Sequence, residues 1–166
     1  TPLLWYVDDT LVFGHDTGFS LDPTARFLDR LFTWTGRAAL GFDQSETIGA
    51  LPIHGLEAVV AQLGFSLTDI QKITFSLWFV APGLSMYALL HHLNNRSDAW
   101  VFRLTGTGLY MFNHFLLQGW FVAERTKFSL VAAMPFVLMM VMLVAERRIG
   151  PVKAGLLIGI VVGLLN

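Results

Sequence analysis

The chain has 166 residues, of which 54% are hydrophobic and only 14% are charged. Soluble domains usually carry about 25% charged residues, so this composition excludes an ordinary soluble protein and indicates a membrane protein. The net charge of −1 excludes a nucleic-acid-binding protein, which needs a basic face. The absence of cysteine excludes disulfides and thiolate metal sites.

Carboxylates are concentrated near the amino-terminal end, ahead of every segment that is long and apolar enough to cross a membrane. Residues 6–23 hold four of the 12 acidic residues, namely Asp8, Asp9, Asp16 and Asp22. Asp22 followed by Pro23 predicts a helix start, with Asp as the N-cap and Pro at the first helical position. Asp8 and Asp9 end the apolar run of residues 3–7, which fits either the last turn of a membrane helix or a buried strand.

Two amphipathic helices are predicted before the first long apolar segment. In the first, over residues 23–34, one side carries Phe27, Leu28, Leu31, Phe32 and Trp34. In the second, between Pro52 and Gly64, one face carries Leu56, Val59, Val60 and Leu63, with Glu57 and Gln62 opposite. The first helix is too short to cross a bilayer, so we expect it to lie on the membrane surface.

Hydrophobic segments predict an all-α, polytopic bundle of transmembrane helices. The predicted spans are residues 69–93, 100–122, 128–145 and 151–166. The last has roughly 16 residues, short of the ~20 that a spanning helix needs. We therefore expect a fragment of a larger membrane protein, truncated at both ends.

Several polar residues accompany these spans. Thr68, with Gln71 three residues later, predicts a capping box at the start of the first span. His91 and His92 follow each other on a helix and point about 100° apart, so we expect interface residues rather than a metal site. The second span carries Asn113, His114 and Gln118. One face of it must therefore point at protein or water.

The positive charges of the short turns predict the orientation. Turns 94–103 and 146–153 carry five Lys and Arg residues, against two in turn 123–127. Cytoplasmic loops are enriched in Lys and Arg, so turns 94–103 and 146–153 are predicted to be cytoplasmic. Residues 1–68 would then form the first external loop, with residues 8–68 outside the membrane after a truncated first helix. Residues 69–166 would form the transmembrane part.

Three function classes fit this organisation. The first is an enzyme, in which external carboxylates act as a general base or bind a divalent cation that neutralises a phosphate leaving group. Alternatively, polar residues within the spans can line the pathway of a transporter or lipid flippase. A non-catalytic membrane scaffold is the third possibility. Each candidate residue also has an ordinary structural interpretation. Asp16 can be a loop aspartate that bonds to its own turn, and Glu124 with Arg125 can form an exposed ion pair.

The order of motifs resembles the amino-terminal part of the class C glycosyltransferases, which use polyprenyl-phosphate sugars, and is most like the arabinofuranosyltransferase branch. The matching pieces are HDTGFSLDPTARFLDRLFTW, HGLEAVVAQLG and RLTGTGLYMFNHFLLQGWFVAERTKFSLVAAMPFVLMMV. The resemblance implies a first external loop with two juxtamembrane helices. It also implies transfer of a sugar to a cell-envelope glycan or lipid acceptor, in the plasma membrane of a bacterium or archaeon.

The resemblance also implies site residues. Asp16, in the Asp-Thr pair, matches the catalytic aspartate, and Glu124 matches the acidic position of the second external loop. Arg125 and Asp9 are the further candidate substrate-binding residues. Gly18 stands where a basic residue often follows Asp-Thr, which leaves the donor sugar open. The second loop lacks an Asp-x-Asp pair, so no metal site is assigned, and Mg²⁺ or Mn²⁺ stays a candidate cofactor only.

Overall fold

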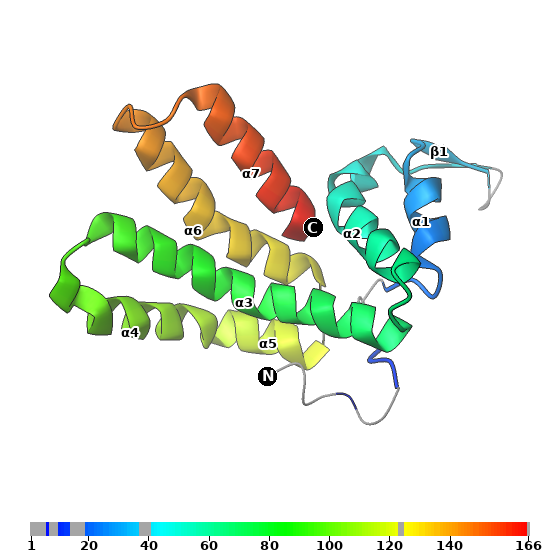
Figure 1. Cartoon of the computed structure of the whole chain (residues 1–166), viewed down its shortest axis with the longest axis horizontal. Coiled ribbons are helices and arrows are strands. Elements are labelled where there is room, and N and C mark those ends of the chain that lie inside the picture. The colour runs from blue at the N-terminus through cyan, green and yellow to red at the C-terminus, as the bar shows by residue number, and fades with distance from the viewer. Residues whose placement is uncertain (1–5, 7–9, 14–18, 37–40, 123–124, 166) are drawn as a thin grey trace.

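A computed structural model describes residues 6, 10–13, 19–36, 41–122 and 125–165. The chain is mostly helical, as expected, with one short antiparallel pair of strands in the amino-terminal part (Figure 1). The elements are α1 (Pro23–Arg30), β1 (Trp34–Thr35), β2 (Phe42–Asp43), the 3-10 helix η2 (Ser45–Ala50), α2 (Leu51–Gln62), α3 (Leu67–Leu93), the 3-10 helix η3 (Ser97–Ala99), α4 (Trp100–Met111), α5 (His114–Val122), α6 (Arg125–Ala145) and α7 (Pro151–Leu165).

The helix α3 is the central element of the bundle. At 27 residues it is roughly 40 Å long, which exceeds the ~30 Å hydrocarbon core of a bilayer. Among the described residues it is the one helix that is long and apolar enough to cross a membrane, by length and composition. Its Phe75 and Trp78 form the core with Leu116 and Ala132. Pro82 lies inside α3 without ending it.

The start of α3 differs from the prediction by two residues. Ser66 is the N-cap, and its hydroxyl accepts a hydrogen bond from the Asp69 backbone N–H at 3.2 Å and donates one to the Asp69 carboxylate at 2.8 Å. The capping box predicted for Thr68 and Gln71 was therefore wrong. Both of these side chains are buried instead, which leaves Gln71 available for a different contact described below.

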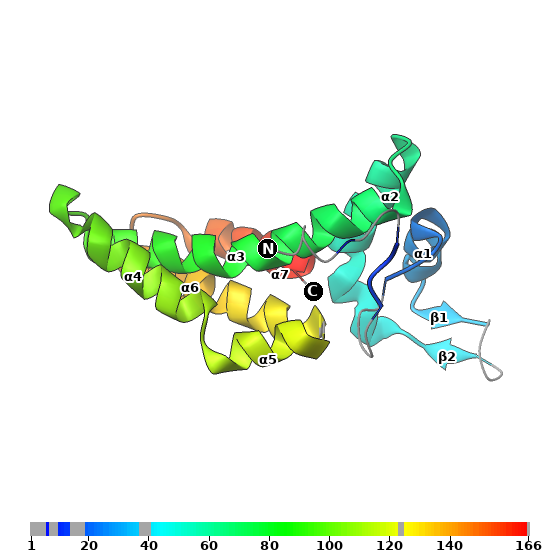
Figure 2. The same ribbon diagram turned by 90° about the horizontal axis from the view of Figure 1, so that it is seen from below.

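The second predicted span, residues 100–122, is not one helix. It divides into α4 and α5, and Figure 2 shows α5 offset from the end of α4. Asn113 causes the break, because its side chain accepts from the Leu116 backbone N–H at 3.0 Å and donates to the Tyr110 carbonyl at 2.7 Å. A side chain that bonds to both flanking turns stabilises a helix end rather than a helix interior. The segments predicted over residues 128–145 and 151–166 are helical, as α6 and α7.

The α3–α4 and α6–α7 turns lie at the same end of the bundle. His92 Nε2 lies 3.1 Å from Glu146 Oε1, so the α3–α4 and α6–α7 turns are neighbours at one end (Figure 1). At this end Arg103 is buried and donates to the carbonyl groups of Arg96 and Ala99 and to His91 Nδ1. His91 and His92 thus contact different partners.

The pair α1–α2 lies at the opposite end of the bundle from these two turns (Figure 1). Two glycines allow close contacts, one between α1 and α2 and the other between α2 and α7. A Cβ atom added at Gly55 of α2 would lie 3.3 Å from the Phe27 ring of α1. A Cβ atom added at Gly163 of α7 would lie 2.6 Å from Pro52 Cγ and 3.3 Å from the Gly49 carbonyl oxygen. The start of α2 therefore packs directly against the last turns of α7.

This contact predicts a difference between two glycines of α7. We expect Gly163→Ala to destabilise the protein by about 1–3 kcal/mol, because the new methyl group would overlap the rigid Pro52 ring. Gly159 has no atom within 4 Å of the same position, so Gly159→Ala should be neutral or slightly stabilising. Thermal unfolding of the two variants in one detergent measures the difference. Equal melting temperatures would rule out the α2–α7 contact.

Candidate functional site

The predicted site residues lie mostly outside the described residues. Asp9, Asp16 and Glu124 belong to the segments that are not described, and Arg125 is described only by its backbone, at the first position of α6. Asp22 is the helix cap that the sequence predicts, since its carboxylate accepts from the Ala25 backbone N–H at 2.9 Å.

Val12 and Asp22, which lie on either side of the segment that contains Asp16, are each held by hydrogen bonds. At one end, Gln71 of α3 bonds to both backbone groups of Val12. The Val12 N–H donates to Gln71 Oε1 at 2.8 Å, and Gln71 Nε2 donates to the Val12 carbonyl at 2.8 Å. At the other end, Asp22 is fixed by its cap and by Ser20, whose hydroxyl accepts from the Asp22 N–H at 3.2 Å. Residues 13–21, which include Asp16, therefore connect two fixed points of the fold.

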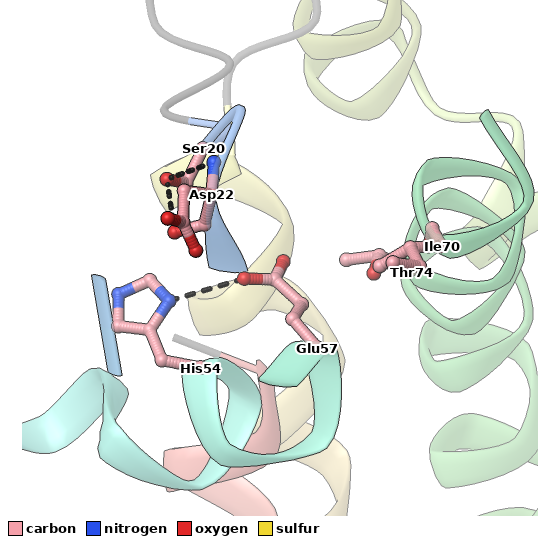
Figure 3. Close-up of polar contacts among 6 residues, drawn as sticks. All are labelled: Ser20, Asp22, His54, Glu57, Ile70 and Thr74. Atoms are coloured by element: carbon pink, nitrogen blue, oxygen red, sulfur yellow. Dashed lines mark hydrogen bonds and ion pairs between the residues drawn. The ribbon is translucent and has the colours of Figure 1, made fainter. Parts of the chain in front are cut away.

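A buried polar cluster lies beneath the start of α1. His54 and Glu57, on the same face of α2, are each only 2% exposed, and His54 Nδ1 lies 3.2 Å from Glu57 Oε2. Figure 3 shows the Glu57 carboxylate reaching from α2 toward the start of α1, where Asp22 is drawn. The other carboxylate oxygen of Glu57, Oε1, is buried and has no hydrogen-bond partner among the residues that the structure describes.

Arg26 of α1 belongs to the same cluster. Burial lowers the pKa of Arg26, as does the positive charge of Arg30, while the negative charge of Glu57 raises it. The negative charge of Glu57 on α2 thus partly offsets the effect of burial on the Arg26 guanidinium of α1. Glu57 is buried and Arg26 is partly buried, and a buried charge without compensation costs several kcal/mol, so the carboxylate benefits from a nearby cation.

Glu57 lies on the buried side of α2, a position that hydropathy alone does not indicate. Of the residues on the predicted apolar face, Val59 is 55% exposed and Leu63 71%, while Glu57 is buried. Faces were assigned by hydropathy, but the inner face of α2 is set by small residues that let α1 approach, namely Gly55 and Ala58. The i, i+3 spacing of His54 and Glu57 was the available signal for a buried pair.

The apolar side assigned to the first amphipathic helix also divides in the structure. Phe27 packs inward on Gly55, whereas the others on that side are exposed, namely Leu28, Leu31, Phe32 and Trp34. The helix is also shorter than predicted, because α1 ends at Arg30 and Trp34 lies in β1. The inner face is therefore narrower than the sequence suggested.

The polar residues of the predicted second span bond locally. Asn113 caps α5, and Gln118 Nε2 lies 2.9 Å from His114 Nε2, one turn away on the same helix. These contacts stay within the α4–α5 segment. The three residues therefore give no support to a transport pathway across the bundle.

No protein-family model matches this chain, and no curated protein and no solved structure was found to be similar to it. The function is therefore inferred from the motifs quoted above and from where the described residues lie. Within the described residues, no group of three His, Asp or Glu side chains could hold a metal ion.

Proposed function

We propose that this chain is the amino-terminal part of an integral-membrane glycosyltransferase. It transfers a sugar from a polyprenyl-phosphate donor to a cell-envelope glycan or lipid acceptor on the external face of the membrane. The observation that supports this most is the doubly anchored segment of residues 13–21. The described residues on either side of Asp16 are held by hydrogen bonds, Val12 to Gln71 and Asp22 through the cap of α1, and catalysis requires a base in a defined position.

The proposed chemistry uses Asp16 as the general base. Its carboxylate takes the proton of the acceptor hydroxyl, and the acceptor oxygen forms a bond to the anomeric carbon of the donor sugar. The bond between that carbon and the phosphate oxygen breaks, and its electron pair leaves with the polyprenyl phosphate. Attack from the side opposite to the phosphate inverts the anomeric configuration.

Three further residues are proposed to bind substrate, namely Asp9, Glu124 and Arg125. A guanidinium such as that of Arg125 complements the phosphate of the donor, and carboxylates accept hydrogen bonds from sugar hydroxyls. No step of this mechanism is assigned to a divalent cation.

The positions of two groups of polar residues favour this proposal over a transporter. A transporter needs polar groups along a path through the bundle, whereas the polar residues of α4 and α5 bond within their own segment. The polar cluster of Arg26, His54 and Glu57 instead belongs to the α1–α2 pair, at one end of the bundle (Figure 1). This arrangement favours chemistry at one membrane face.

An activity measurement tests the proposal. The full-length protein in vesicles is incubated with polyprenyl phosphates that carry radiolabelled pentose or hexose, together with cell-envelope acceptors. We expect protein-dependent labelling of the acceptor and release of polyprenyl phosphate in equal amounts. Movement of the donor across the bilayer without any cleavage of the sugar–phosphate bond would contradict the proposal and favour a flippase.

A further inference from the structure

An open apolar groove of about 880 Å³ lies between α3, α4, α6 and α7. Several of its lining side chains are more than half exposed, including Leu130, Met134 and Val141. The one polar lining group is the Tyr110 hydroxyl, which already donates to the Val131 carbonyl at 2.7 Å. The groove therefore offers contacts to hydrocarbon and none to a polar head group.

One end of this groove lies close to the α6–α7 turn. Val141 lines the groove six positions before Arg147, which is roughly 9 Å along a helix. Leu89 lines it from α3, three positions before His92, and His92 contacts Glu146 of the same turn. A molecule with its hydrocarbon in the groove can thus place its polar end at the α6–α7 turn.

The α6–α7 turn carries exposed positive charge. Arg147 and Lys153 are exposed and form no ion pair with any residue that the structure describes, whereas Arg148 pairs with Glu146 at 3.0 Å. Arg147 also has a φ of 58°, in the left-handed region, and its backbone N–H bonds to the Val144 carbonyl at 2.9 Å. Glycine is the residue preferred at such a helix end, so a long cation there is unusual.

We propose that this end of the bundle binds an anionic phospholipid. Arg147 and Lys153 contact the head-group phosphate, and one acyl chain lies in the groove past Val141. Basic pockets between membrane helices recognise anionic head groups in this manner, and the long stems of Arg and Lys reach from the hydrocarbon edge to the head-group level. The inference rests on the proposed location in a membrane, but it does not depend on sugar transfer.

The net charge of the lipid follows from the same contacts. A zwitterionic head group carries its own cation, which competes with Arg147 and Lys153 for the phosphate. An anionic head group leaves the phosphate available to both side chains. Selectivity should therefore come from the turn, while the groove contributes affinity for any acyl chain.

Native mass spectrometry of the purified full-length protein tests the proposal, with phosphatidylglycerol, phosphatidylcholine and glycerol 3-phosphate as probes. We expect phosphatidylglycerol to bind at least tenfold more tightly than phosphatidylcholine. Glycerol 3-phosphate, which has the anionic group without acyl chains, should not bind at millimolar concentration. Equal affinity for the two lipids would overturn the proposal, and so would tight binding of glycerol 3-phosphate, which would indicate a site for free phosphate compounds.

Substitutions test the contribution of the basic side chains and that of the apolar groove separately. Arg147→Gln with Lys153→Gln should lower phosphatidylglycerol affinity on the order of tenfold or more and leave phosphatidylcholine unchanged. Arg96→Gln removes an exposed charge at the same end of the bundle and is the matched control. Val141→Trp, at a half-exposed position, should weaken both lipids by filling the groove. Unchanged phosphatidylglycerol binding in the double variant, at an unchanged melting temperature, would overturn the proposal.

The outcome is independent of the glycosyltransferase assignment. Selective lipid binding in a protein without transferase activity would contradict the proposed function alone. Transferase activity in a protein that binds both lipids equally would contradict the lipid site alone.

Discussion

Replacing Asp16 with asparagine is expected to abolish sugar transfer by the full-length protein. An amide cannot accept the proton of the attacking hydroxyl, and a general base contributes about 10²–10⁴-fold to rate. The loss should therefore appear as a fall in kcat of that size, with a much smaller change in KM. Initial rates of label transfer at several acceptor concentrations measure both constants.

Asp22 supplies the matched control for this experiment. Its carboxylate caps α1 through the Ala25 N–H, and asparagine caps a helix about as well as aspartate does. Asp22→Asn should therefore retain both the fold and the transfer rate, although it removes the same charge from the same part of the chain. Full activity of Asp16→Asn, or an equal loss in Asp22→Asn, would show that no specific base lies at Asp16.

The largest effect on stability is expected for Glu57→Ala. Removing one partner from a buried pair typically costs about 3–5 kcal/mol, because the other group stays buried without its partner. Here the remaining groups are His54, at 3.2 Å, and the guanidinium of Arg26. For a chain of this size the melting temperature should fall on the order of 10 °C.

Glu146→Ala is the control for this substitution. It breaks a similar His–Glu contact of 3.1 Å with His92, but at the other end of the bundle, where the glutamate is 39% exposed. Exposed ion pairs contribute about 0–1 kcal/mol, so the melting temperature should change little. Comparable losses in the two variants would mean that burial of Glu57 does not determine its contribution.

Most helix positions could be predicted from the sequence, because long apolar segments and strong caps decide them locally. Asp22-Pro23 specifies the start of α1, and α3 coincides with the first predicted span to within two residues at its start. The division of the second span was missed because Asn113 was interpreted as part of a polar face. Asparagine is also a good N-cap, and only the contacts with Tyr110 and Leu116 decide between the two roles.

The buried cluster could not be predicted in the same way. Which face of α2 is internal depends on how closely α1 approaches, and hydropathy gives no measure of that distance. Gly55 permits the approach, and it buries Glu57 while Val59 and Leu63 stay exposed. The role of Gln71 was hidden for a similar reason, because its partner, Val12, is 59 positions away in the sequence.

The two hydrogen bonds between Gln71 and Val12 also fix a register. A primary amide that donates to the carbonyl and accepts from the N–H of one residue imitates a neighbouring β-strand, although it comes from a helix. Shifting the chain by one residue would bring a different side chain against α3. The two bonds therefore make Val12 the fixed point from which the length of the following segment is measured. Residues inserted ahead of Val12 leave the length of that loop unchanged. Residues inserted between Val12 and Asp22 lengthen it between two fixed ends, so natural variation in loop length should be found before Val12 rather than after it.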